Sequence, residues 1–343
     1  MLNINYFFHY IFLKFSRFLK QLHLYGFFIA FWSFVYPFYR IFGPLKPYFA
    51  INKHKAILKY LSRHYLNIPE HFSQNYNIYN TSIDPLSTLW VSWWDGEETM
   101  PPIVKMCYKS IIKHAGKHPV QLITKENYRN FISIPDYILD RVNCGNMKIT
   151  HFSNIIRANL LYEYGGIWMD ATILTLKDIS FDDIPFFTLK APAPKNNGVT
   201  MSCFAGISSL HRPYHYNKNS PKISRWSGFL LAGKKGSVVF EYMREILYAY
   251  WKDHNDQIDY VLYDYTIALG YDNIPEMKRM IDNVPCNEIE KFVLEKNLNN
   301  EYNEDAFSFY KQTTFHKLTW KDKFNTHTKD NKQTIYGHLL ENN

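Results

Sequence analysis

The stretch SNIIRANLLYEYGGIWMDAT, residues 153–172, decides the fold. Ser153 is a good N-cap for a helix over residues 154–164, and Gly165-Gly166 ends that helix with a tight reversal. The apolar run that follows predicts a strand over residues 167–176, interrupted near Asp170. A helix that turns directly into a buried strand is typical of an α/β domain.

The same alternation continues on both sides of this stretch. Strands are expected over residues 89–94 and 120–124, and a helix that begins with Pro101-Pro102 should run to about residue 114. Further helical patterns cover residues 127–132, 137–142, 236–251 and 258–269, whereas 191–225 is typical of a loop. We therefore expect a three-layer α/β domain with a mostly parallel sheet.

Asp170 is the main candidate for chemistry. The predicted strand delivers its carboxylate to the carboxyl edge of the sheet, where nucleotides bind in open α/β sheets. A carboxylate there can hold a hard divalent cation, which would neutralise a diphosphate. Asn154 and Arg157 share one face of the preceding helix, and Arg157 could hold a phosphate or a sugar hydroxyl.

The pattern S-[DN]-x-x-R-x-x-L-L-x-x-x-G-G-x-W-x-D-A-T resembles the capsular polysaccharide synthesis glycosyltransferases. More distantly it is similar to the DXD-containing sugar transferases, which include fungal mannosyltransferases and the clostridial glucosylating toxins. Matches in the same order, at residues 90–96, 226–231, 250–252, 258–260 and 317–321, extend the resemblance over about residues 85–340.

The resemblance implies a GT-A type fold and a retaining transfer from a nucleoside diphosphate sugar, with Mn²⁺ or Mg²⁺. Retention by same-face attack and retention through a covalent intermediate both stay open. Two positions depart from the family pattern. The usual DXD is Asp170-Ala171-Thr172 here, and Asn154 stands where many relatives carry Asp.

Each central residue has a functional and a structural interpretation. Asp170 would be the metal and diphosphate residue, or else an acid at a strand end. Arg157 would bind the donor, or pair with Glu163 or another acid. The resemblance also gives position 154 to the sugar hydroxyls, and a polar residue at the helix start is the alternative for Asn154. Thr172 could bond a metal-bound water or be a β-branched strand residue. Gly166, a candidate in donor binding, permits a tight reversal and close backbone approach.

Several outlying residues complete the predicted site. Trp90 or Trp93 could stack on the nucleobase, and Asp95 could hold the base or ribose. Asp264 is a candidate catalytic acid near the sugar, because an acid on an apolar helix is costly unless it is paired. The resemblance implies a C-terminal segment that closes over the diphosphate, with Lys317 on phosphate and His316 on the metal. Residues 211–225 could form a lid or a basic solvent-exposed loop.

The N-terminal fifth differs from the rest of the chain. Residues 1–69 contain nine Lys or Arg and no acid, and they hold all of the net charge of +8. Apolar residues at helical spacing with basic residues between them predict an amphipathic helix in the membrane interface. A helical cap packed on the catalytic core and a single membrane span are the alternatives. A nucleic-acid arm is disfavoured, because such an arm should be polar.

These patterns predict two regions and one activity. Residues 1–75 would form a membrane-associating helical region, with residues 1–60 on the membrane surface, and residues 76–343 the transferase domain. We expect a hexose, carried by UDP on the resemblance alone, to move to a saccharide acceptor at the cytoplasmic face of a bacterial cell membrane. This acceptor would be lipid-linked. A catalytically inactive, membrane-bound scaffold that binds saccharide is the alternative.

Overall fold

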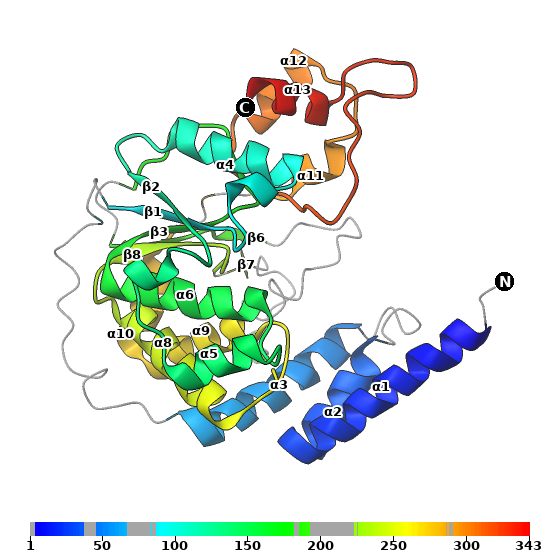
Figure 1. Cartoon of the computed structure of the whole chain (residues 1–343), viewed down its shortest axis with the longest axis vertical. Helices are drawn as coiled ribbons and strands as arrows, with labels where there is room; N and C mark the ends of the chain where they lie inside the picture. Colours follow the sequence, from blue (N-terminus) through cyan, green and yellow to red (C-terminus); the bar gives the residue numbers. More distant parts are fainter. Residues whose placement is uncertain are drawn as a thin grey trace.

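A computed structural model describes residues 4–37, 46–66, 83, 87–181, 185–192, 223–224, 226–285, 287 and 291–343. Its centre is a five-stranded sheet in the order β2-β1-β3-β8-β5, with helices on both faces (Figure 1). The strands are β1 (Leu89–Ser92), β2 (Val120–Ile123), β3 (Gly165–Asp170), β5 (Phe186–Thr188) and β8 (Leu230–Lys234). The predicted α/β class is confirmed.

The sheet is mixed rather than mostly parallel. β1 pairs in parallel with β2 and β3, whereas β8 runs antiparallel to both β3 and β5. The parallel half contains the predicted strand–helix alternation, in which each strand is followed by a crossover. β8 arrives after the long stretch 193–222, which lies outside the described residues.

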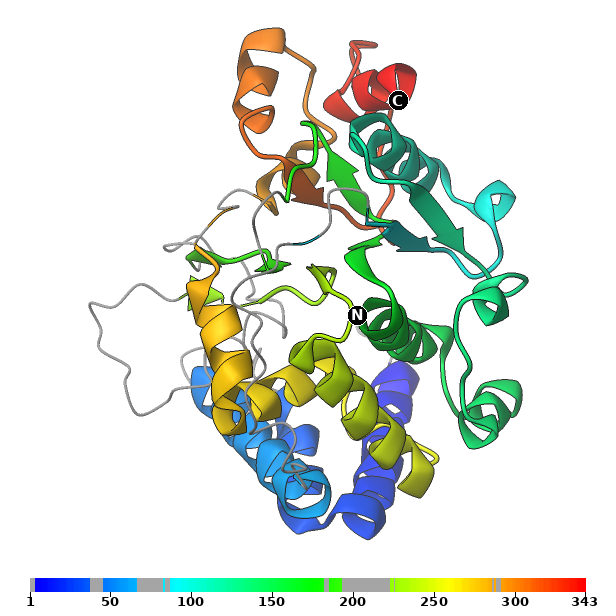
Figure 2. The same ribbon diagram turned by 90° about the vertical axis from the view of Figure 1, so that its left-hand side faces the viewer.

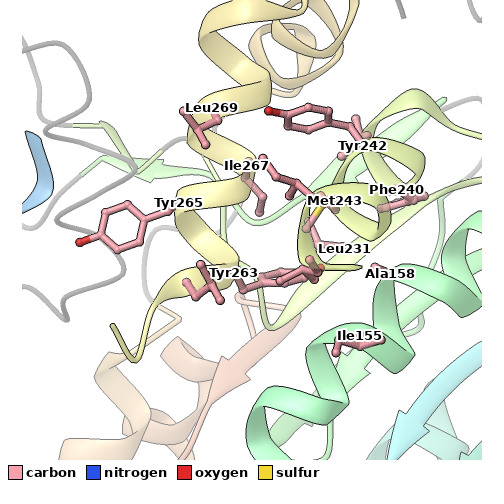
Figure 3. Close-up of a cluster of buried hydrophobic side chains, with 14 of the residues drawn as sticks. Ile155, Ala158, Leu231, Phe240, Tyr242, Met243, Tyr263, Tyr265, Ile267 and Leu269 are labelled. Atoms are coloured by element: carbon pink, nitrogen blue, oxygen red, sulfur yellow. The ribbon is translucent and has the colours of Figure 1, made fainter. Parts of the chain in front are cut away.

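Two apolar clusters cover the two faces of the sheet, because side chains alternate along each strand. Trp90, Trp168 and Leu231 belong to the cluster on one face, and Leu89 and Met169 to the cluster on the other. The first cluster packs under α6 (Ile149–Glu163), α8 (Val238–Asp253) and α9 (Leu262–Asn273), whose side chains interdigitate in Figure 3. The second packs under α4 (Pro102–His114), whose bounds match the predicted helix.

Two helix starts differ from the prediction. α6 begins at Ile149, so Ser153 lies inside the helix and donates to the carbonyl of Thr150 instead of capping it. α9 begins only at Leu262, because Asp259 folds a turn in which its carboxylate accepts from the N–H of Val261. At α9 a local side-chain–backbone bond, which the apolar pattern does not reveal, sets the geometry before the helix.

The predicted strand over residues 167–176 is broken after Asp170. Its first part is β3, and its second part is β4 (Ile173–Thr175), which pairs with β9 (Phe315–Lys317) in a separate sheet. A third two-stranded sheet joins β6 (Ala191–Pro192) and β7 (Ile223–Ser224). The break at residues 171–172 therefore brings the C-terminal part of the chain to the end of β3.

The remaining helices extend the layers. The C-terminal helices lie beyond α4 at the end of the molecule opposite α1–α3 (Figures 1 and 2). Their bounds, with those of the remaining short helices, are α5 (Asp136–Asn143), α10 (Pro275–Asn283), α11 (Val293–Asn297), α12 (Glu304–Tyr310), α13 (Ile335–Asn342), η5 (Glu97–Thr99) and η6 (Tyr128–Asn130).

The N-terminal region forms three helices, α1 (Ile4–Tyr25), α2 (Phe27–Val35) and α3 (Lys46–Tyr65). Tyr25, Ile57 and Leu61 join the cluster under α8 and α9, so these helices pack on the sheet domain. No helix in the described ranges has both the length and the apolar composition to cross a bilayer. The predicted boundary at residue 75 lies outside the described residues.

Candidate functional site

The candidate site lies where the parallel strands β1 and β3 end together. Ser92 is in register with Asp170, so the residues after β1 and the carboxylate of Asp170 share the carboxyl edge of the sheet. α6 runs back along β3, and Arg157 near the middle of α6 lies beside this edge, where it donates to Asp170. Sequence order and strand register thus bring Arg157 and Asp170 together.

Three side chains donate to the carboxylate of Asp170. Oδ1 accepts from the Arg157 guanidinium at 2.9 Å and from Nε1 of Trp168 at 3.0 Å. Oδ2 accepts from Nζ of Lys317 at 3.1 Å. The Asp170 side chain is 30% exposed, so the carboxylate is partly accessible to a ligand.

The charge of Asp170 is stabilised by this arrangement. Burial acts to raise the pKa of Asp170, but the Lys317 and Arg157 charges outweigh it. Hydrogen bonds from Trp168 and Lys317 act in the same direction, and the pKa stays below its usual range. Asp170 is therefore ionised throughout the neutral range.

Arg157 is buried and bonded on two sides. Its side chain is 7% exposed, and it donates to the carbonyl oxygen of Gly228 as well as to Asp170. The guanidinium lies 4.8 Å from the ring centre of Trp168 and 4.7 Å from that of Tyr263. Arg157 is thus paired with an acid, as its structural interpretation expected, and that acid is Asp170 rather than Glu163.

Lys317 bridges the two ends of the Asp170–Thr172 pair. Its Nζ lies 2.5 Å from the Thr172 hydroxyl as well as 3.1 Å from Asp170. The pairing of β9 with β4 places Lys317 opposite Ile173, and the N–H of Leu318 bonds the carbonyl of Thr172. The backbone therefore fixes Lys317 beside these two side chains.

The described side chains around Asp170 offer a divalent cation one carboxylate and place two cationic groups beside it. Within the described part of the chain, no group of three or more His, Cys, Asp or Glu is arranged to hold a metal. Asp170 contributes one carboxylate, and both of its oxygens already accept from cationic side chains. The Lys317 ammonium group lies between the Asp170 carboxylate and the Thr172 hydroxyl.

An aromatic pair borders the same edge of the sheet. Trp93, directly after β1, packs edge-on against Trp320 with ring centres 5.9 Å apart, and its Nε1 donates to Thr99. Trp320 is 49% exposed, so the pair offers a partly open aromatic surface. Asp95 lies in the adjoining turn and is paired with Lys125 at 3.3 Å.

Three predicted site residues are placed away from Asp170. Trp90 is 2% exposed and donates to the carbonyl of Gly165, so it packs in the core. Gly166 is the second residue of β3, about 13 Å along the strand from Asp170. His316 is fully buried, with Nε2 bonded to the carbonyl of Tyr310, because it alternates with Lys317 along β9. The geometry thus does not bring these three to the site.

Asp264 lies within electrostatic range of Arg157, and Asn154 stands on the same helix as Arg157. Asp264 is 2% exposed and accepts from Nε1 of Trp226 at 3.1 Å. Burial raises the pKa of Asp264 to about 7, although Trp226 and the charge of Arg157 act to lower it. Asn154 is half-buried, one turn before Arg157 on α6. The predicted lid over residues 211–225 lies outside the described residues, apart from the two residues of β7, Ile223 and Ser224.

The sequence analysis missed the residues that hold Arg157. Gly228 accepts from its guanidinium, and a Cβ at that glycine would meet the Tyr263 ring at 3.2 Å. Trp168 was also missed, although its position two residues before Asp170 puts both side chains on one strand face. That spacing is a signal which could have identified it.

The chain was compared with known proteins. The sequence profile of the family described as "Capsular polysaccharide synthesis protein" matches residues 44–339. The chain is also similar to glycosyltransferase afumC of Aspergillus fumigatus, with 25% identity over 141 residues. Those residues are 41% of this chain and 30% of the fungal protein, so the chain spans less than a third of that relative.

Proposed function

The chain belongs to the capsular polysaccharide synthesis protein family, and from that premise we propose that it is a glycosyltransferase. It would move a hexose from a nucleoside diphosphate sugar to a saccharide acceptor. The observation that carries this proposal is the group of Asp170, Arg157, Thr172 and Lys317 at the carboxyl edge of the sheet. Partial sequence similarity to a fungal protein named a glycosyltransferase supports the same reaction class.

The transfer reaction requires the site to stabilise the departing diphosphate. An acceptor hydroxyl oxygen forms the new bond to the anomeric carbon, while the bond from that carbon to the diphosphate oxygen breaks. The bonding electron pair stays on the diphosphate, and the hydroxyl proton passes to one of its oxygens. Preorganised positive groups at this point lower the barrier, because they meet the charge that develops there.

The residues of the site divide into two roles. Lys317, with its side chain 20% exposed, is accessible and would contact the diphosphate. Asp170 and the buried Arg157 would orient Lys317 and fix the edge of the pocket. The Trp93–Trp320 pair would support the nucleobase by stacking, and Asn154 would face the sugar from α6.

The finer features follow the resemblance and the N-terminal composition. We propose a GT-A type fold, UDP as the nucleotide, and a lipid-linked saccharide acceptor at the cytoplasmic face of a bacterial membrane. The region 1–60 would hold the enzyme on that surface. Exposed apolar side chains on α1 and α2 support this attachment, among them Phe12, Phe15, Leu19, Phe27 and Phe28.

The test is a hydrolysis and transfer screen of the purified chain. UDP-, GDP-, CMP- and dTDP-sugars would be supplied with Mn²⁺, with Mg²⁺ or with EDTA. We expect turnover with one nucleotide class and a loss of at least about 100-fold in Asp170→Asn, because the Lys317 ammonium loses its charged partner. Asp178→Asn, an exposed acid paired only with His114 among the described contacts, is the control and should keep wild-type rates.

Two outcomes would contradict the proposal. Full activity in Asp170→Asn would remove the site from this edge of the sheet. Nucleotide-sugar binding without turnover, for every class and every acceptor tried, would instead favour the inactive saccharide-binding scaffold.

A further inference from the structure

Lys317 occupies the place that the DXD resemblance gives to a metal ion. The resemblance expects two acids, two residues apart, to hold that ion. Here the second position is Thr172, and the Lys317 ammonium lies between its hydroxyl and the Asp170 carboxylate, at 2.5 and 3.1 Å. A lysine therefore bridges the pair of side chains that would otherwise ligate the metal.

We infer that the Lys317 ammonium is a built-in cation that contacts the donor diphosphate, so that donor binding needs no divalent metal. The inference rests on the proposed function and deepens it, because it names the group that meets the diphosphate. It is an alternative to the Mn²⁺ or Mg²⁺ expected from the resemblance.

Charge counting favours the ammonium over a metal ion. Arg157 and Lys317 together carry two positive charges against the single negative charge of Asp170. A divalent cation at Asp170 would have to displace Lys317 or lie within a few ångströms of two cations. Without a metal, the same three groups already present a net positive charge to a diphosphate, at the carboxyl edge of the sheet.

The geometry leaves Lys317 able to bind a further anion. An ammonium has three N–H donors, and Asp170 and Thr172 accept two of them. The positions of these two acceptors set the direction of the third N–H, and the Lys317 side chain is partly exposed to solvent. The Phe229 ring, 5.1 Å from Nζ, packs beside the ammonium and limits its movement.

Thr172 is the residue that decides between the two cations. Its hydroxyl accepts from the ammonium without adding a charge, and β9 stays paired beside it through Leu318. An aspartate at position 172 would instead put two carboxylates on the same ion, which is a donor set suited to a hard divalent cation. The inference can therefore be tested by replacing the Lys317 ammonium with a divalent metal ion.

The first experiment measures the affinity of the full chain for UDP and GDP by calorimetry, in EDTA and in Mn²⁺. We expect the affinity of the preferred nucleotide to agree within about twofold in the two buffers. Lys317→Met should lower it at least about tenfold, because a charge-assisted contact with phosphate is lost, whereas Lys317→Arg should retain most of it. Lys323→Met, an exposed lysine of the same segment, is the matched control.

The second experiment installs the metal site. Thr172→Asp combined with Lys317→Ala places carboxylates at 170 and 172 and removes the ammonium. We expect this variant to bind Mn²⁺, seen as loss of the free-ion signal in electron paramagnetic resonance, and to bind the nucleotide only when Mn²⁺ is present. The wild-type chain with nucleotide should leave the Mn²⁺ signal unchanged.

The outcomes separate this inference from the proposed function. Nucleotide binding that disappears in EDTA in the wild-type chain would overturn the inference and leave the glycosyltransferase proposal standing. Equal affinity in Lys317→Met and wild type would do the same. If no nucleotide binds in either buffer, to a chain with a cooperative thermal transition, both proposals fail.

Discussion

Asp264 combines deep burial with a short list of partners. It is 2% exposed, and its carboxylate accepts a described hydrogen bond from the indole N–H of Trp226. That donor is uncharged, so it does not neutralise the charge of the carboxylate. Burial therefore raises the pKa of Asp264 to about 7. A carboxyl group of this kind is nearly half protonated at neutral pH, and it makes the stability of the fold depend on pH.

The sign of that dependence can be stated. The pKa of Asp264 is near 4 when the chain is unfolded and about 7 when it is folded. The folded chain binds the extra proton between these values, so stability is full below pH 4 and is lost as pH rises through 7. Asp264→Asn keeps an acceptor for Trp226 and should stabilise the fold at pH 8 by up to about 4 kcal/mol.

Urea unfolding at pH 5 and pH 8 measures this effect. The variant should show a smaller difference between the two pH values than wild type, and Asp330→Asn, an exposed control, should show none of the change. We expect transfer activity in Asp264→Asn to stay within a fewfold of wild type. A loss of 100-fold or more would instead give Asp264 the catalytic role that the sequence predicted.

Sequence reasoning identified the residues that meet at Asp170 better than those around them. Arg157, Asp170, Thr172 and Lys317 were all named, and the structure brings them together. Trp90 and His316 were named as well but lie in the core. Both sheet faces are covered by apolar clusters, so the strand sequences do not show which side chains face the open edge.

At the scale of elements, the turn between α6 and β3 depends on two glycines. Gly165 and Gly166 have φ of 68° and 96°, in the region that other residues rarely adopt. A Cβ on Gly166 would lie 2.2 Å from the carbonyl oxygen of Thr88, where the backbone before β1 passes close to β3. The two glycines therefore let β3 pass close to the backbone before β1 and fix where α6 lies relative to β3. This placement puts Arg157 beside Asp170.

We expect Gly166→Ala to destabilise the fold by about 3 kcal/mol or more, since it adds both a clash and a strained backbone. Gly145→Ala is the matched control: its φ is 72°, but nothing lies within 4 Å of the added Cβ. That change should cost about 1–2 kcal/mol. Thermal unfolding of both variants measures the difference, and equal losses would show that the approach of Thr88 does not constrain the turn.

The bounds of elements with strong local sequence signals were predicted closely, whereas the pairing between distant strands was not. The prolines at the start of α4 marked where it begins, whereas the N-cap of α6 was placed at Ser153, five residues after the observed N-cap, Lys148. The division of residues 167–176 into β3 and β4 was anticipated only as an interruption. The pairing of β4 with β9 joins segments about 140 residues apart, and no local pattern encodes a contact of that range.

At the scale of the whole molecule, the N-terminal helices have one face on the sheet domain. The hydroxyls of Tyr25 and Tyr250 lie 2.9 Å apart, and Nδ1 of His54 lies 2.6 Å from the hydroxyl of Tyr265. The buried ion pair of Lys53 and Asp259 adds a charged contact. The packing on the core expected under the cap alternative is therefore present.

α1 and α2 also carry large apolar side chains that are exposed to solvent. Phe12, Phe15 and Leu19 on α1 are 68%, 50% and 49% exposed, and Phe27 and Phe28 on α2 are exposed as well. Basic residues lie among those of α1 in the sequence, with no acid in residues 1–69. Packing on the core together with exposed apolar side chains and exclusively basic charges is what the proposed attachment to an anionic bilayer requires of these helices.

The last prediction concerns the exposed apolar side chains of α1. Replacing Phe12, Phe15 and Leu19 together by glutamine should lower partitioning onto vesicles that contain phosphatidylglycerol by at least about tenfold, because each exposed apolar group contributes burial in the bilayer. Co-sedimentation measures the loss. The double change Ile112→Gln and Phe309→Gln removes exposed apolar groups elsewhere in the chain and should leave partitioning unchanged. Since all five side chains are exposed, thermal unfolding should be nearly unaffected, and equal partitioning of the two variants would assign the membrane surface to another part of the molecule.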